Sequence, residues 1–164
     1  MESKVKLSTF SLLLTLLLTG ILIAAVAFFL WNHEDKGIIG AVILFFLLIS
    51  GWLYGPVTIA ADEKSVTIKS ILRKQRLDIS NIKSVELFQP TLGSLRIFGS
   101  GGYMGYWGIF RGGSLGKYVA YYGKASDCFL IRIKNGDNYV LGCEKPEEMV
   151  NYINSKIKGK SEFC

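Results

Sequence analysis

The apolar residues follow two patterns, which divide the chain near Gly55-Pro56. Before that point lie two uncharged apolar runs, Phe10 to Trp31 with 22 residues and Ile38 to Tyr54 with 17 residues. As helices, these runs extend about 33 Å and about 25 Å, close to the roughly 30 Å of a bilayer's hydrocarbon core. The backbone must satisfy its own hydrogen bonds in lipid, so each run is expected to be helical. Gly55 and Pro56 end the second helix.

The two runs are joined by a link of five residues, Asn32 to Lys36. So short a link makes the helices antiparallel neighbours, and residues 1–55 are expected to form a transmembrane hairpin. Basic residues favour both ends of the hairpin over the link, which predicts that both termini are cytoplasmic. Gly51 and Gly55 are four residues apart, a spacing that lets helices pack closely. We expect this spacing to serve contact between the two helices of one chain rather than dimerisation.

Two other interpretations of the apolar runs stay open. The first run is also compatible with a signal peptide cleaved near Ala25-Val26-Ala27, although it continues beyond that point. A buried helical hairpin in a soluble protein is the second. Neither run contains an ionisable residue, which argues against a transporter, a pump or a proton relay.

After Pro56 the pattern changes to an alternation with a period of two, which is typical of strands. Asn135 to Asn138 predicts a hairpin turn, and Pro146 to Lys158 predicts an amphipathic helix with Met149 and Ile153 on its apolar face. We expect a mainly antiparallel β-barrel over residues 56–164, capped by the helix at 146–158. The predicted strands are residues 57–61, 66–69, 74–79, 82–88, 117–122, 128–134 and 139–143.

A glycine-rich stretch interrupts this pattern between Gly93 and Gly123, which contains ten of the chain's 18 glycines. Large aromatic side chains are interleaved with the glycines, which is not typical of a flexible linker. We expect an ordered insert with close backbone approaches. A phosphate-binding loop is not indicated, because the spacing of neither glycine-rich phosphate motif is present.

The order of elements, the stretch Asp78-Ile79-Ser80-Asn81-Ile82-xx-Val85, and the hairpin followed by a helix resemble bacterial pleckstrin-homology-like (PH) domains. The block from Phe98-Gly99-Ser100-Gly101-Gly102 to Gly116-Lys117-Tyr118 is similar to membrane-linked PH-like proteins of Bacteroides-type bacteria. The resemblance covers roughly Pro56 to Lys158. It implies a PH-like fold. For a bacterial protein, the two apolar runs and the charge bias of the hairpin predict the inner (cytoplasmic) membrane, with both termini cytoplasmic. The chain has no match to the phosphoinositide-binding motif of eukaryotic PH domains.

The formal net charge is +6, and residues 1–55 contribute nothing to it, because three lysines there balance three carboxylates. The positive charge therefore belongs to the polar segment. Four basic residues are concentrated in KSILRKQR, and they are candidate contacts for anionic lipid headgroups or, alternatively, a solvated hairpin tip. These residues are Lys69, Arg73, Lys74 and Arg76. Nucleic acid binding is not expected, because the basic patch is short.

The aromatic side chains of the glycine-rich insert are candidates for a protein-binding surface. The alternative is that they cover the barrel or lie at the lipid interface, where Tyr and Trp are stable. The candidate partner surface consists of Tyr103, Tyr106, Trp107, Phe110 and Arg111.

No set of residues indicates catalysis, a cofactor or a metal site. His33 is the only histidine, and Cys128, Cys143 and Cys164 show no metal-binding spacing. A bridge between Cys128 and Cys143 is expected only if the domain lies outside the cytoplasm. The sequence therefore favours a non-enzymatic, membrane-anchored binding module for a protein or anionic lipids. The alternative is a structural subunit of a larger membrane complex, assembled through the hairpin.

Overall fold

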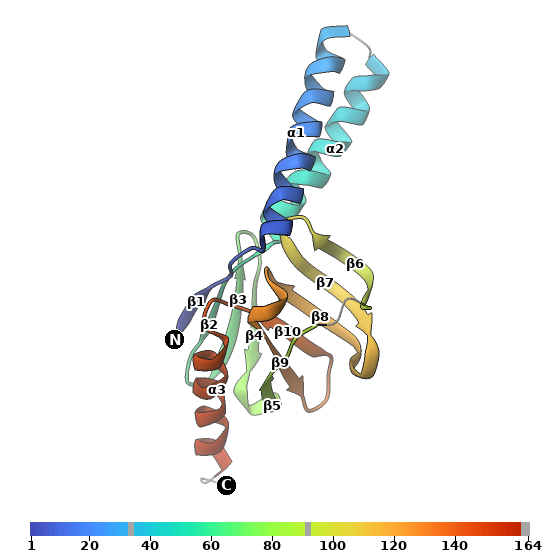
Figure 1. Ribbon diagram of the computed structural model, residues 1–164. Coiled ribbons are helices and arrows are strands. Elements are labelled where there is room, and N and C mark those ends of the chain that lie inside the picture. The colour runs from blue at the N-terminus through green and yellow to red at the C-terminus, as the bar shows by residue number, and fades with distance from the viewer. Residues whose placement is uncertain (33–34, 91–92, 162–164) are drawn as a thin grey trace.

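A computed structural model describes residues 1–32, 35–90 and 93–161. Two long helices form a rod that projects from one end of a β domain, and a third helix lies alongside the strands (Figure 1). The rod consists of α1 (Thr9–Asn32) and α2 (Asp35–Tyr54), which contact each other along their length. Both are long and apolar enough to cross a membrane, and their side chains are mostly exposed rather than packed into a protein core.

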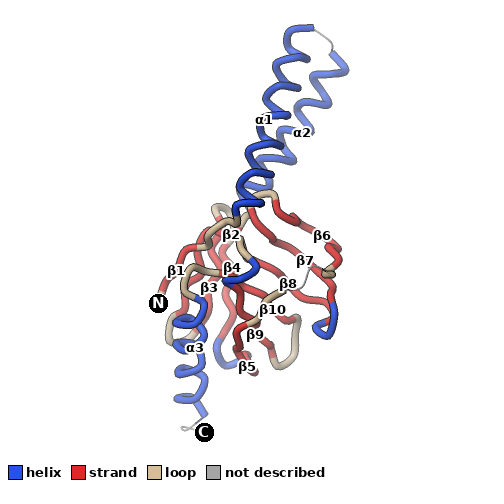
Figure 2. The backbone as a smooth tube through the Cα atoms, in the orientation of Figure 1, coloured by secondary structure: helices blue, strands red, loops and turns tan. Residues whose placement is uncertain are grey.

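The hairpin is inserted between two neighbouring strands of one sheet. Strand β1 (Glu2–Lys4) precedes α1 and pairs antiparallel with β2 (Pro56–Ala61), which follows α2 directly, with Ser3 opposite Ile59. The chain therefore leaves the β domain and returns to it at the same place (Figure 2). The sequence pattern did not predict β1, because its three residues are too few to show an alternation.

The β domain contains two sheets. The first has the order β1-β2-β3-β4, and the second has the order β5-β9-β10-β8-β7-β6. All pairs are antiparallel except β8 with β10, where Ala120 lies opposite Val140. The remaining strands are β3 (Ser65–Ser70), β4 (Lys74–Asp78), β5 (Ile82–Leu87), β6 (Leu95–Gly102), β7 (Gly105–Gly112), β8 (Gly116–Tyr122), β9 (Cys128–Ile133) and β10 (Asn138–Gly142).

The prediction of a β-barrel was wrong in one respect, because the two sheets do not close on each other. Within the described residues, β4 and β6 each pair on one side only. The β6–β7 hairpin directs its turn to the helices, where the Met104 N–H donates to Thr15 Oγ1 (3.0 Å), instead of folding over β4. A seam consequently stays open between β4 and the β7–β8 face.

The opposite gap between the sheets is covered by α3 (Pro146–Ser161), as the amphipathic pattern predicted. Met149 and Ile153 are fully buried against a core that includes Ile59 and Phe129 from the two sheets. The Asn154 side chain donates to the Val85 carbonyl of β5 at 3.1 Å. The helix continues to Ser161, three residues past the expected end, since a single glycine in a helix lowers stability without stopping it.

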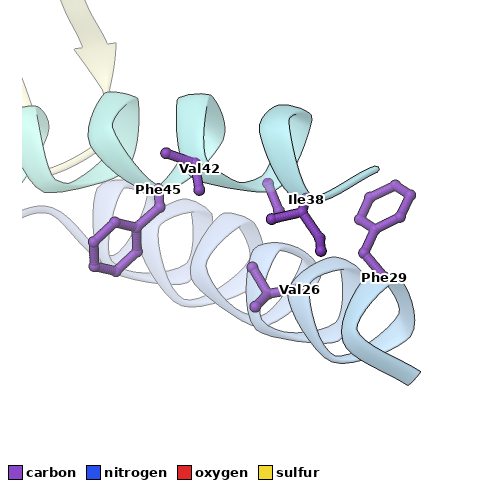
Figure 3. Close-up of a pocket in the computed structure, with 6 residues that line it drawn as sticks. Val26, Phe29, Ile38, Val42 and Phe45 are labelled. Carbon is purple, nitrogen blue, oxygen red and sulfur yellow. The ribbon is translucent and has the colours of Figure 1, made fainter. Parts of the chain in front are cut away.

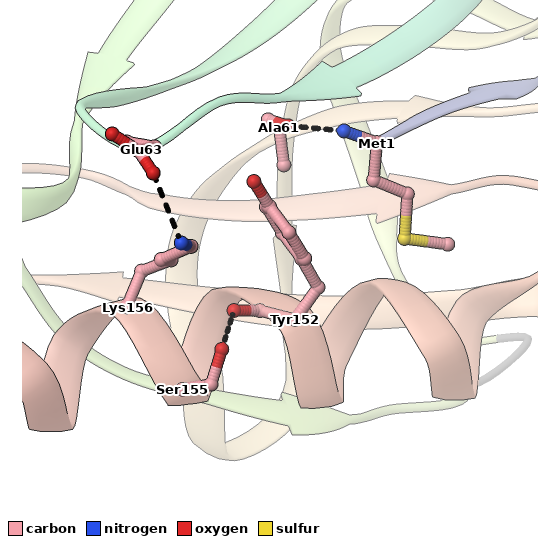
Figure 4. Close-up of polar contacts among 6 residues, drawn as sticks. All are labelled: Met1, Ala61, Glu63, Tyr152, Ser155 and Lys156. Atoms are coloured by element: carbon pink, nitrogen blue, oxygen red, sulfur yellow. Dashed lines mark hydrogen bonds and ion pairs between the residues drawn. The ribbon is translucent and has the colours of Figure 1, made fainter.

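Polar contacts connect α3 and β1 to the β2–β3 end of the first sheet (Figure 4). Lys156 Nζ lies 3.3 Å from a carboxylate oxygen of Glu63 and 5.4 Å from the centre of the Tyr152 ring. The Met1 amino group donates to the Ala61 carbonyl at 2.7 Å. These contacts hold α3 and β1 beside the same strand.

Candidate functional site

The β3–β4 turn, which carries the predicted basic patch, contacts the end of α2. The Leu72 N–H donates to the Leu53 carbonyl (3.2 Å) and the Ser70 hydroxyl donates to the Tyr54 carbonyl (3.1 Å). Both acceptors belong to the last turn of α2, where carbonyl groups have no partner inside the helix. Ile71 and Leu72 are 60% and 63% exposed at this turn. The turn thus presents apolar side chains where α2 meets the β domain.

The four basic candidates have different surroundings, although Lys69 lies opposite Lys74 across β3 and β4. Arg73 and Lys74 directly follow the docked turn and are exposed. Arg76 lies two residues farther along β4 and lines a separate hollow, which Asp137 of the β9–β10 turn also lines. Lys69 forms an ion pair with Glu2 of β1 at 2.8 Å, and this contact lowers the pKa of the Glu2 carboxyl. Arg73 and Lys74 are therefore the two charges of the patch that adjoin the turn on α2.

The turn of the glycine-rich insert contacts both membrane-type helices. Besides the bond from Met104 to Thr15 of α1, the Tyr103 hydroxyl donates to the Leu48 carbonyl of α2 at 3.2 Å. The Ser100 hydroxyl donates to the Tyr103 carbonyl at 2.6 Å and closes the turn. The prediction of an ordered insert is confirmed, since it forms β6, β7 and β8.

Close backbone approach explains two of the glycines in this insert. Gly99 and Gly108 are paired across β6 and β7 at φ values of 113° and 119°, which favour glycine. A Cβ at Gly108 would meet the Phe98 carbonyl oxygen, and one at Gly99 would meet the Trp107 carbonyl oxygen. Side chains at either position would push the strands apart.

The aromatic candidates are mostly used in internal contacts. Tyr106 stacks on Tyr122 with ring centres 4.8 Å apart, and Phe110 stacks on Tyr118 at 5.9 Å. Phe110 is buried, whereas Arg111, the next residue along β7, is exposed. The Tyr103 hydroxyl donates to the Leu48 carbonyl of α2, as described above. The five residues thus do not share one exposed face, and a protein partner at this surface stays a prediction.

Trp107 belongs to a different environment at the junction with α2. Its ring stacks on Tyr54 with centres 6.0 Å apart. Its indole N–H is buried and has no acceptor among the described residues. Both aromatic rings lie in the wall of a cavity in the open seam.

This cavity has a volume of about 500 Å³ and lies between the end of α2, β4 and the β7–β8 face. Ligand pockets usually have volumes of roughly 300–1,000 Å³. Apolar side chains form most of the wall, and Arg73 is its one charged lining residue in the described part of the chain. Gln75 also lines it, but its amide donates to the Tyr139 hydroxyl at 3.0 Å. The wall includes Ser50, Tyr54, Arg73, Trp107, Ile109 and Val119. Sequence reasoning did not find this site, because the wall combines residues from five separate elements, α2, β4, β6, β7 and β8.

A smaller cavity of about 150 Å³ lies between α1 and α2, near the link that joins them (Figure 3). Its lining is entirely apolar, with side chains such as Val26, Phe29, Ile38 and Phe45. It offers no group for polar recognition. We regard it as a space between helices rather than a ligand site.

The residues considered for chemistry remain inert or lie outside the described chain. Cys128 and Cys143 are free, buried thiols, and burial raises the pKa of both, so neither is activated as a nucleophile. In the ranges that the structure describes, no group of three or more His, Cys, Asp or Glu side chains is placed to hold a metal. His33 and Cys164 lie outside the described residues.

The model of the bacterial PH domain family matches residues 57–157, from β2 into α3. The chain belongs to the bacterial PH domain family. The resemblance to bacterial PH domains seen in the sequence is thus confirmed. No curated protein and no solved structure matched the chain. The PH domain match excludes β1 and both long helices, and membership of a PH domain family suggests a binding module.

Proposed function

We propose that this PH domain is a membrane-anchored module that recognises anionic lipid headgroups at the cytoplasmic face of the bacterial inner membrane. The family supports a binding role without catalysis, and the helical hairpin supports attachment to a membrane. The basic bias of the flanks supports the cytoplasmic side. The proposal therefore combines a known class of domain with its position next to a bilayer.

The observation that carries the proposal is the docking of the β3–β4 turn on the last carbonyls of α2. The candidate span Gly37–Tyr54 has 18 residues and extends about 27 Å, so its end lies near one surface of the hydrocarbon core. Ile71 and Leu72 then reach the interface, and Arg73 and Lys74 reach the headgroups. A solvated hairpin tip, the alternative from the sequence, does not explain two exposed apolar residues beside the end of a membrane helix.

A protein partner is less well supported by the geometry. The aromatic candidates contact either tyrosines of β8 or the helix α2, and Arg111 alone among the five candidate residues is exposed. Each basic side chain near an anionic surface contributes about 1 kcal/mol of attraction. Arg73 and Lys74 together therefore supply about 2 kcal/mol, or about a 30-fold change in affinity.

The test removes the hairpin, so that any binding to a bilayer comes from the β domain alone. The Val5 N–H donates to the Val57 carbonyl at 3.0 Å, so a two-residue Asn-Gly turn joining these strands replaces the helices. Circular dichroism establishes that the shortened protein is folded. We expect it to sediment with phosphatidylglycerol vesicles and not with phosphatidylcholine vesicles, and to be released by salt.

The double variant Arg73→Gln/Lys74→Gln should bind about 30-fold more weakly. The matched control, Lys83→Gln/Lys134→Gln, removes the same charge from exposed positions on β5 and after β9, and it should lose much less. If both double variants lost the same affinity, binding would depend on the net charge of the protein and not on Arg73 and Lys74. Binding that is indifferent to lipid charge would contradict the proposal.

A further inference from the structure

The cavity in the open seam lies beside the end of a candidate membrane helix. Ser50 and Tyr54 line it, and both belong to α2, the helix that is apolar enough to cross the bilayer. A hydrocarbon chain that follows α2 out of the bilayer reaches a mainly apolar wall where the helix ends. Entry beside α2 therefore limits the exposure of methylene groups to water, which is costly.

The lining matches an amphipathic ligand with one anionic end. Apolar and aromatic side chains from β7 and β8, such as Ile109 and Val119, form the inner wall. Gly108, which has no side chain, leaves room at the same wall. Arg73 lines the cavity from the turn that touches α2, and it forms no ion pair with any residue that the structure describes. A guanidinium group suits a phosphate, because it donates two parallel hydrogen bonds.

We propose that this cavity binds one anionic phospholipid from the bilayer, with an acyl chain between the sheets and the phosphate on Arg73. This inference rests on the proposed function and deepens it: the domain extracts part of a single lipid instead of only touching the headgroup layer. The open seam, which prevents a closed barrel, provides the entrance. The volume of about 500 Å³ is within the range of ligand cavities and suits part of one lipid, not several.

Trp107 makes the occupant detectable in the full-length protein. The chain has three tryptophans, and Trp31→Phe with Trp52→Phe leaves the one in the cavity wall as the only indole. This variant is reconstituted into phosphatidylcholine nanodiscs that contain a small fraction of phosphatidylglycerol. Bromine atoms are placed on the acyl chains of one lipid or the other. Brominated phosphatidylglycerol should quench Trp107 at low fractions and with saturation, whereas the same fraction of brominated phosphatidylcholine should quench it weakly.

Two further variants separate the cavity from general attraction. Arg73→Gln should lower the preference for the anionic lipid about fivefold, the expected contribution of one cation, while Arg76→Gln, outside the cavity lining, should leave it nearly unchanged. Val119→Phe should fill the cavity and reduce quenching by both lipids. If this variant does not fold, the comparison of Arg73→Gln with Arg76→Gln decides alone.

The results distinguish failure of this inference from failure of the proposed function. Equal quenching by both brominated lipids, unaffected by Arg73→Gln, would overturn the lipid cavity. Sedimentation of the shortened protein with anionic vesicles would still support headgroup recognition. Loss of that sedimentation together with saturable quenching would mean the reverse, a lipid-holding site without surface recognition.

Discussion

Replacing Thr15 by Val should loosen the contact between α1 and the β6–β7 turn. Thr15 is 7% exposed, and its Oγ1 accepts the Met104 N–H at 3.0 Å. Valine has a similar shape but no acceptor, so the Met104 N–H loses its partner at a junction with little water. An unpaired buried donor costs about 1–3 kcal/mol. The lost donation from Thr15 to the Ser11 carbonyl (2.6 Å) adds little, since that carbonyl belongs to the helical ladder.

Hydrogen exchange of the Met104 amide in nanodiscs measures this effect directly. The cost corresponds to an opening that is about 5-fold to about 140-fold more frequent, and exchange should accelerate by the same factor. Thr15→Ser is the matched control, because it keeps a hydroxyl acceptor, and it should exchange at nearly the wild-type rate. Slow exchange in a folded Thr15→Val protein would refute the reasoning and assign the docking to packing alone.

Three further predictions concern the β domain. Phe129 is fully buried between the sheets, so Phe129→Ala should lower the free energy of unfolding by about 3–5 kcal/mol in urea titrations. A smaller change would mean that the surrounding core collapses into the cavity that the missing ring leaves. Gly108→Ala should lower the free energy of unfolding by at least about 1–2 kcal/mol in the same assay, because Gly108 has a positive φ and a Cβ there would meet the Phe98 carbonyl oxygen. The control Gly93→Ala should be nearly neutral, since a Cβ at Gly93 has open space around it. The pKa values of the Cys128 and Cys143 thiols are raised in the folded protein, so both thiols lose their protons more easily in the unfolded chain. Their contribution to stability should be constant below about pH 8.5 and fall above it, and rapid labelling of Cys128 or Cys143 in the native protein at pH 8 would contradict this.

The sequence predicted the elements whose signal is local. The uncharged runs became α1 and α2, and the face of Met149 and Ile153 packs on the core. All seven predicted strands are present, with ends within one residue of those predicted. The strands β6 and β7 were not predicted within the insert, because glycines interrupt the alternation of side chains. Strand β1 was missed because it is polar and short. The parallel pairing of β8 with β10 depends on the path of the chain between them, which no local pattern specifies.

The candidate site was less predictable, because it depends on contacts between distant segments. KSILRKQR was correctly identified as a basic hairpin, but only the structure places its turn on Leu53 and Tyr54. The aromatic candidates were chosen by composition, and their stacking partners decide which of them are exposed. The cavity wall joins Tyr54 to Trp107 and Val119, and its existence depends on a seam that the expected barrel would have closed.

If the hairpin inserts into a membrane as proposed, the pairing of β1 with β2 links completion of the β domain to that insertion. During synthesis β1 emerges first, and its partner strand follows only after both long helices have been made. If only one helix crossed the bilayer, the two strands would lie on opposite sides of it. The Lys69–Glu2 ion pair and the ladder around Ser3 and Ile59 would then be lost. The first sheet thus acquires its edge strand only when both ends of the hairpin lie on the same side of the bilayer, so that chains with a single inserted helix remain incompletely folded and open to proteolysis.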